Sequence, residues 1–168
     1  VWSGNGHTYY LLESGSWSDS EAEAVSLGGH LATINDQAEN DWIWSTFIPL
    51  LPAGPPESGN AGLWLGYTDS EDYGASEGNW QWISGELPGY TNWEPGEPND
   101  FPFGPFGEDF AFMWVLSNGS WFDADNAGSG GAAYGIVEVA AVPLPPAVWL
   151  FGTGLLGLGI LGRRKKKS

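Results

Sequence analysis

The acidic side chains of this sequence have almost no basic partners. The 168-residue chain has 21 Asp and Glu against five Lys and Arg, a formal net charge of −16, and all five basic residues lie at 163–167. His7 and His30 are therefore the only cationic side chains before residue 163. Acids that converge in the fold must be neutralised by protons, histidine or bound cations, and a divalent metal is the expected choice. The same lack of basic residues excludes nucleic acid as a partner.

One short segment offers oxygen ligands at a spacing that suits Ca²⁺. Glu97-Pro98-Asn99 places a carboxylate and an amide two residues apart. Side chains alternate along an extended backbone, so both groups point the same way. Calcium binds about six to eight such oxygens. The segment lies within residues 84–109, a polar stretch rich in Pro and Gly, and an irregular loop of that length in a compact domain is usually functional.

Catalysis has little support. The chain has two histidines, no cysteine and no serine in a nucleophile-elbow pattern. A pair of carboxylates can hydrolyse glycosides, but nothing selects two acids from 21. We therefore expect a binding protein and not an enzyme.

The pattern along the chain predicts an α+β domain. A capping-box pattern that begins at Ser18 predicts a helix through Leu27, and a second helix is expected from Asn35 or Asp36 to Phe47, before Pro49. The absence of cysteine excludes a disulfide scaffold, and the 11 Trp, 6 Tyr and 8 Phe are enough to build a core. Short apolar runs predict strands of a small antiparallel sheet at residues 63–67, 80–83, 110–116 and 134–139.

The last residues differ from the rest of the chain. A proline-rich break at 142–146 is followed by an uncharged apolar run and the basic cluster. Residues 144–162, taken as a helix of 19 residues at about 1.5 Å each, span about 28 Å, close to the hydrocarbon thickness of a membrane. We expect a transmembrane segment with the basic end in the cytoplasm, and a buried core helix is the alternative. The chain begins at Val1, which suggests an export signal that has been removed or omitted.

This tail resembles the PEP-CTERM sorting tails of Gram-negative bacteria. It starts with VPLP (142–145), continues with the Gly/Leu-rich WLFGTGLLG (149–157) and ends with basic residues. Leu144 stands where the family usually has Glu. The resemblance implies processing by an exosortase-type membrane protease. It also implies a location at the cell surface or in the extracellular matrix, with membrane anchoring at least for a time.

The remainder of the chain resembles the C-type lectin-like fold, with two helices, small antiparallel sheets and a long metal-binding loop. The resemblance spans about residues 7–139, and it predicts a domain at 1–141 and the sorting tail at 142–168. The segments that carry it follow the family's order: GGHLATI (28–34), LWLGY (63–67), WQW (80–82), TNW (91–93), EPND (97–100), GED (107–109) and WFD (121–123).

The resemblance implies a shared site for Ca²⁺ and sugar at Glu97, Asn99, Glu108 and Asp123, with a cis peptide before Pro98. The order Glu-Pro-Asn is similar to that of mannose-type members. An auxiliary calcium site is also implied, and a solvated acidic surface is the alternative for its residues. These are Asp69, Glu77, Asp100, Glu108 and Asp109.

The sequence departs from this family at several positions. Phe122 replaces an asparagine that would give an amide oxygen to the metal, so that a water or Asp125 would have to substitute. Phe101, Phe103 and Phe106 lie between the implied ligands, where they form a contact surface, part of the core or a stacking face for sugar. The family's four cysteine positions hold Ala24, Phe110, Asn126 and Val137.

Two functions follow from these observations. The first is calcium-dependent binding of a polysaccharide or other glycan at a bacterial surface or in a biofilm matrix. The second is structural: the domain self-associates into a homo-oligomer or fibre through its aromatic surfaces, and any calcium only stabilises the loop.

Overall fold

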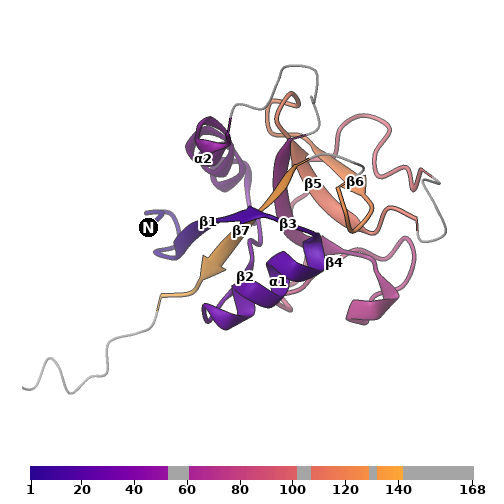
Figure 1. Cartoon of the computed structure of the whole chain (residues 1–168), viewed down its shortest axis with the longest axis horizontal. Coiled ribbons are helices and arrows are strands. Elements are labelled where there is room, and N and C mark those ends of the chain that lie inside the picture. The colour runs from indigo at the N-terminus through magenta and orange to yellow at the C-terminus, as the bar shows by residue number, and fades with distance from the viewer. Residues whose placement is uncertain (53–60, 102–106, 129–131, 142–168) are drawn as a thin grey trace, which may run out of the picture.

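The chain folds around one sheet with two α-helices (Figure 1). The computed structural model describes residues 1–52, 61–101, 107–128 and 132–141. The predicted helices and strands are present, together with three strands that the apolar pattern does not predict, β1, β2 and β6. In chain order the elements are β1 (Thr8–Ser14), α1 (Trp17–Ser26), β2 (His30–Leu31), α2 (Gln37–Phe47), η1 (Ile48–Leu50), β3 (Gly62–Thr68), η2 (Glu71–Tyr73), β4 (Gln81–Trp82), β5 (Phe110–Trp114), β6 (Trp121–Ala124) and β7 (Ala133–Val139).

The sheet is mixed, which corrects the expectation of a small antiparallel sheet. Its strand order is β1-β7-β3-β5-β6, with β2 paired to β7 and β4 paired to β3. β3 and β7 are parallel, with Leu63 opposite Tyr134, whereas the other pairs are antiparallel. Strand direction here depends on how β7 returns from the sheet edge to lie between β1 and β3. The pattern of apolar residues within each strand carries no information about that return.

The helices begin at side-chain caps. Asp36 caps α2 by accepting a hydrogen bond from Glu39 N at 2.9 Å, as the sequence predicts. For α1 the expected start at Ser18 is wrong by two residues, because Ser16 Oγ accepts from Asp19 N at 3.1 Å. The earlier start places Trp17 inside the helix, where its side chain is fully buried.

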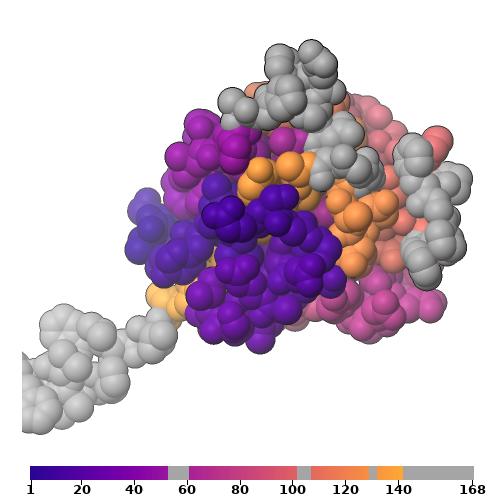
Figure 2. Space-filling view, in the orientation of Figure 1, coloured from indigo at the N-terminus to yellow at the C-terminus, as the bar shows by residue number. Residues whose placement is uncertain are grey.

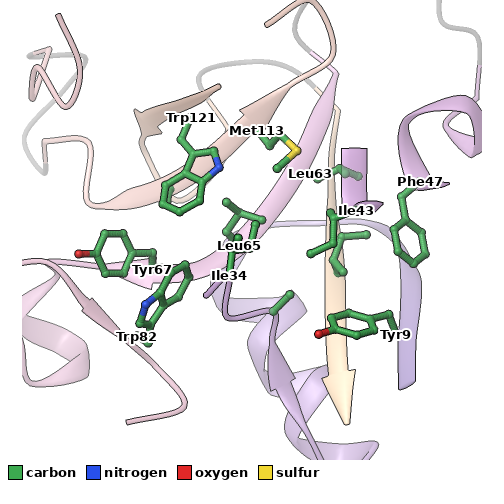
Figure 3. Packing of buried hydrophobic residues seen from close by; sticks show 13 residues of the cluster. Tyr9, Ile34, Ile43, Phe47, Leu63, Leu65, Tyr67, Trp82, Met113 and Trp121 are labelled. Atoms are coloured by element: carbon green, nitrogen blue, oxygen red, sulfur yellow. The ribbon is translucent and has the colours of Figure 1, made fainter. Parts of the chain in front are cut away.

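Aromatic side chains make up much of the core (Figure 3). Tyr67 stacks on Trp82 with ring centroids 4.4 Å apart, and Trp121 lies edge-on to both. Trp17 Nε1 donates to Leu65 O at 2.7 Å, so this buried indole also satisfies its polar group. The largest apolar cluster takes residues from α2 and from six strands, which are β1, β3, β4, β5, β6 and β7.

The residues at the family's four cysteine positions make other contacts. Ala24 and Val137 pack together in a small apolar cluster with Leu12. The Asn126 carboxamide accepts from Ser18 N at 2.9 Å and donates to Ser18 Oγ at 3.1 Å, which ties the segment after β6 to the start of α1. Phe110 stacks 4.7 Å from Trp17. Packing and hydrogen bonds thus replace covalent links.

A buried asparagine joins α2 to β6, and its removal gives a stability prediction. Asn40 is fully buried, accepts from Trp121 Nε1 at 2.8 Å and donates to Gly119 O at 3.1 Å. We expect Asn40→Ala to lower the free energy of unfolding by about 1–3 kcal/mol, because the buried indole N–H loses its acceptor. The control Asn79→Ala removes exposed contacts and should change it by less than about 0.5 kcal/mol. Urea unfolding measures both, and equal effects would contradict the assignment.

The C-terminal tail lies outside the described residues. In the part of the chain that is described, no helix has the length and apolar character needed to cross a membrane. The predicted transmembrane segment at 144–162 falls in the undescribed region, as does the rest of the sorting tail. In the space-filling view the N-terminal part, indigo to purple, fills the left and centre, salmon residues lie on the right, and orange residues lie in the centre and at the lower left (Figure 2).

Candidate functional site

The long loop is fixed to the edge strand that carries one of the implied ligands. Glu94 N donates to Trp121 O at 2.9 Å and Trp121 N donates to Asn92 O at 2.8 Å, so the loop runs beside the start of β6. The Glu97–Pro98 peptide is cis, as the resemblance implies. Asp123 lies further along β6, and Glu108 lies just before β5. These elements bring residues far apart in the sequence to one place.

Hydrogen bonds hold the loop against the two buried carboxylates. Asp123, 5% exposed, accepts from Asn99 N at 2.9 Å and from Asp100 N at 2.6 Å. Glu108, 6% exposed, accepts from Phe101 N at 3.0 Å. Asn99 Nδ2 donates to both carboxylate oxygens of Glu97 at 2.7 Å. The carboxylates therefore organise the loop backbone around themselves.

These residues line a pocket of about 500 Å³, which we call the first pocket. All four residues implied for the shared calcium and sugar site border it. The rest of its lining is apolar. Of the three phenylalanines that lie between the implied ligands in the sequence, Phe101 lines the pocket, whereas Phe103 and Phe106 lie outside the described residues. The full lining is Glu97, Asn99, Phe101, Glu108, Phe112, Trp114, Phe122, Asp123, Ala124 and Gly128.

The charge of the first pocket has no cationic counterpart among the described side chains. His7 Nδ1 lies 2.6 Å from Glu138 and His30 Nδ1 lies 2.8 Å from Glu21, so both histidines are paired elsewhere. Burial, a hydrogen bond to Asp123 and the charge of Asp123 together raise the pKa of Glu97 to about 7. The pocket thus holds more negative charge than the described residues neutralise, and a cation would relieve it.

A second acidic pocket, of about 930 Å³, borders the same loop, and we call it the second pocket. Four of the five residues implied for the auxiliary site line it: Asp69, Glu77, Asp100 and Asp109. The fifth, Glu108, lines the first pocket. Asp125, the alternative considered for the asparagine missing at Phe122, also lines the second pocket.

Asp69 is the residue of the second pocket whose surroundings best suit a cation. Its side chain is 3% exposed, Oδ2 accepts from Gly78 N at 2.9 Å, and Oδ1 is buried with no hydrogen-bond partner. Burial and the charges of Glu77 and Asp109 raise the pKa of Asp69 to about 6. Burial, Glu77 and Asp100 likewise raise the pKa of Asp109. A buried acceptor without a partner is costly, and a metal ion would satisfy it.

The donor chemistry of both pockets fits calcium. Carboxylate and amide oxygens are the ligands that this hard cation takes. Among the described residues, however, no three acidic or histidine side chains already lie close enough together to hold an ion. The carboxylates of the first pocket are engaged in hydrogen bonds with the loop. Calcium binding therefore requires these side chains to exchange some of those bonds for the metal.

The raised pKa values predict how the stability of the metal-free domain depends on pH. Asp69 and Glu97 hold their protons more tightly when folded than when unfolded, so the folded state binds more protons between about pH 4 and about pH 7. The free energy of unfolding therefore falls as pH rises through this window. We expect the urea midpoint in chelator to be lower at about pH 7.5 than at about pH 5. A midpoint that rises over this window would contradict the prediction.

The sequence matches the family model described as the Lectin C-type domain over residues 13–105. This match covers more than half of the chain. The chain belongs to the C-type lectin domain family. The family assignment agrees with the two helices, the mixed sheet and the cis peptide in the long loop.

Curated relatives match over part of their own length. The chain is 30% identical over 120 residues to human C-type mannose receptor 2, which covers 71% of the chain and 7% of that protein. It is 31% identical over 108 residues to mouse tetranectin, covering 64% of the chain and 48% of the relative. Human C-type lectin domain family 10 member A is 29% identical over 96 residues, 55% of the chain and 25% of the relative. The chain therefore spans less than half of each of these proteins.

Solved structures share the fold. The human scavenger receptor C-type lectin carbohydrate-recognition domain has a TM-score of 0.64 at 27% identity, over 84% of this chain and 95% of that chain. The cow CD23 carbohydrate-recognition domain, solved with a GlcNAc2Man3 oligosaccharide, has a TM-score of 0.61 at 26% identity, over 81% and 89%. A calcium-independent type II antifreeze protein has a TM-score of 0.63 at 24% identity, over 84% and 92%. The fold alone therefore does not decide whether calcium is bound.

Proposed function

We propose that this C-type lectin domain binds carbohydrate through a calcium ion held in the first pocket. The proposed ligands are Glu97, Asn99, Glu108 and Asp123. The observation that carries the proposal is that these four side chains, taken from three separate segments, border one pocket. Both histidines are paired elsewhere, so the described residues leave this charge to a bound cation or to protons.

The residues of the pocket have defined roles in this proposal. When bound, calcium supplies the positive charge and the open coordination positions that a pair of neighbouring sugar hydroxyls can fill. The carboxylates of Glu97 and Glu108 accept hydrogen bonds from the sugar hydroxyls, and the Asn99 amide donates one. Asp123 holds the loop in place through the backbone N–H groups of Asn99 and Asp100.

A second ion in the second pocket would stabilise the loop without touching the sugar. Its proposed ligands are Asp69, Glu77, Asp100 and Asp109, and the unpartnered Asp69 Oδ1 supports the assignment. Asp100 links the two pockets, because its backbone N–H donates to Asp123 and its Oδ1 accepts from Glu108 N at 3.1 Å. Filling the second pocket thus orders the loop that borders the first.

Mannose-type glycans are the proposed substrate class. The Glu97-Pro98-Asn99 order supports this, as do the relatives named for mannose and solved with a mannose-containing oligosaccharide. The test is binding of the protein to immobilised mannan and to galactan, each in calcium and in chelator. We expect retention on mannan in calcium alone. Retention on mannan that is the same in chelator as in calcium, or no retention on either polymer, would refute the proposal.

The location and assembly of the protein extend this proposal. We place the lectin domain at residues 1–141 outside the cell and the sorting tail at 142–168 in a membrane through residues 144–162. There an exosortase-type protease of a Gram-negative bacterium would process it. The structural alternative, self-assembly into an oligomer or fibre, is favoured by the exposed apolar side chains of Phe101 and Leu116. Sedimentation that depends on concentration and is indifferent to calcium and sugar would support that alternative.

A further inference from the structure

The first pocket has two chemically different halves. Glu97, Glu108 and Asp123 form a charged rim, whereas Phe112, Trp114 and Phe122 form an aromatic half on the neighbouring strands. Phe112 and Phe122 are register partners across β5 and β6. The Trp114 and Phe122 rings meet edge-to-face with centroids 5.6 Å apart. The aromatic half is thus built into the sheet.

The aromatic half presents partly exposed rings above a buried support. Phe112 is buried and packs 5.2 Å from the fully buried ring of Trp64. Trp114 and Phe122 are half-buried, so part of each ring faces the open pocket. Phe101, 52% exposed, adds a ring on the loop side. Apolar area left open beside a charged rim gains free energy when an apolar group covers it.

The aromatic half of the first pocket limits which substituent of a sugar can lie against it. A hydroxyl pointed at the ring of Phe112 or Phe122 gives up hydrogen bonds to water, and these rings offer it no hydrogen-bonding atom, which is unfavourable. A methyl or acyl group in the same place would bury its own apolar surface against the rings. Phe122 is central because it precedes the rim residue Asp123 on β6 and its ring contacts Trp114. The family resemblance predicts an amide at this position.

We propose that the first pocket selects sugars that carry a methyl-bearing substituent, either a deoxy carbon or an acetyl group, next to the hydroxyls that meet the carboxylate rim. This inference rests on the proposed carbohydrate binding and names its substrate class. Phe122 and Trp114 are the specificity-determining residues. The sugar sits with its hydroxyl edge on the rim and its apolar substituent on the rings.

Two matched pairs of sugars test this inference on the full chain in calcium. D-mannose is compared with 6-deoxy-D-mannose, and D-glucose with N-acetylglucosamine, by competition against the bound polysaccharide. We expect the methyl-bearing member of at least one pair to bind about four- to tenfold more tightly, the gain for burying one apolar group. Phe122→Ala should reduce that ratio to about one, and Trp114→Ala should lower it. The control Tyr10→Ala, an exposed aromatic on β1, should leave it unchanged.

The outcomes separate this inference from the proposal beneath it. Equal binding within both pairs overturns the inference and leaves calcium-dependent sugar binding intact. A preference that persists unchanged in both Phe122→Ala and Trp114→Ala overturns the assignment to the aromatic half. If no sugar competes in calcium, the proposed function fails and the inference fails with it. The wild-type ratios alone decide the matter if a variant does not fold.

Discussion

Asp123→Asn is expected to weaken calcium binding by at least about 100-fold and to abolish calcium-dependent glycan binding. The change removes one negative charge from the first pocket. It also removes one of the carboxylate oxygens that accept hydrogen bonds from the backbone N–H groups of the loop. Asp123 accepts from Asn99 N and Asp100 N, so the loop that carries the other ligands loses part of its support. Even residues that only orient a metal ligand typically cost about 10- to 100-fold in metal affinity when changed. Calorimetric titration of calcium into the metal-free protein measures the effect.

The control for this experiment makes the same chemical change elsewhere. Asp41→Asn removes one carboxylate from the exposed surface of α2, where Asp41 contacts only the Gln37 amide at 2.7 Å among the hydrogen bonds described. It should leave calcium affinity within about twofold of the wild type, because exposed charges are well screened. If Asp123→Asn binds calcium as well as Asp41→Asn does, the ion is held somewhere other than the first pocket.

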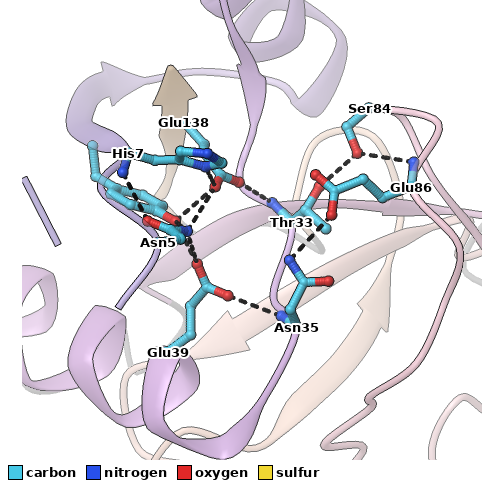
Figure 4. A network of polar contacts seen from close by, with 9 residues as sticks. Asn5, His7, Thr33, Asn35, Glu39, Ser84, Glu86 and Glu138 are labelled. Atoms are coloured by element: carbon cyan, nitrogen blue, oxygen red, sulfur yellow. Dashed lines mark hydrogen bonds and ion pairs between the residues drawn. The ribbon is translucent and has the colours of Figure 1, made fainter. Parts of the chain in front are cut away.

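Glu138→Ala is expected to lower the free energy of unfolding by about 3 kcal/mol, the largest stability effect that we predict. Glu138 on β7 accepts from Tyr9 Oη at 2.7 Å and from Thr33 N at 2.9 Å, and lies against His7 (Figure 4). These contacts join the N-terminal strand to the segment before α2. Removing the carboxylate leaves the buried Thr33 N–H without its acceptor, which costs much more than losing a surface contact.

The same network supplies the control. Glu86 lies at its exposed end and accepts a hydrogen bond from Asn35 Nδ2 at 3.2 Å (Figure 4). Glu86→Ala should change the free energy of unfolding by less than about 0.5 kcal/mol. Urea unfolding at constant pH compares the two variants. A small effect of Glu138→Ala would show that Tyr9, which is also bonded to Glu39, keeps the N-terminal strand in place without Glu138.

The parts of the fold that depend on local signals could be predicted. Asp36 caps α2 and Pro49 follows its end, and the run at 63–67 is the centre of β3. β1 is missed because its alternation is weak: Tyr10 is exposed and faces solvent, although it is apolar. The parallel pairing of β3 with β7 depends on contacts between residues far apart in the chain, and the apolar pattern within each strand does not show which strands pair.

The site could be predicted in its charged part alone. The type and order of Glu97, Asn99, Glu108 and Asp123 follow the family's pattern, and the structure brings all four to one pocket. The aromatic half could not be found, because Phe112 and Trp114 look like ordinary alternating residues of a strand. Only the pairing of β5 with β6 places them beside Phe122. The replacement of asparagine by Phe122 was visible, but its meaning depends on those neighbours.

A crystal structure of the protein grown with calcium and mannose tests the central claim most directly. We predict one calcium ion with oxygens of Glu97, Asn99, Glu108 and Asp123 at about 2.3–2.6 Å, and two sugar hydroxyls on the same ion. An ion bound in the second pocket alone, with Glu97 still paired to the Asn99 amide and Asp123 still bound by the loop backbone, would contradict the account.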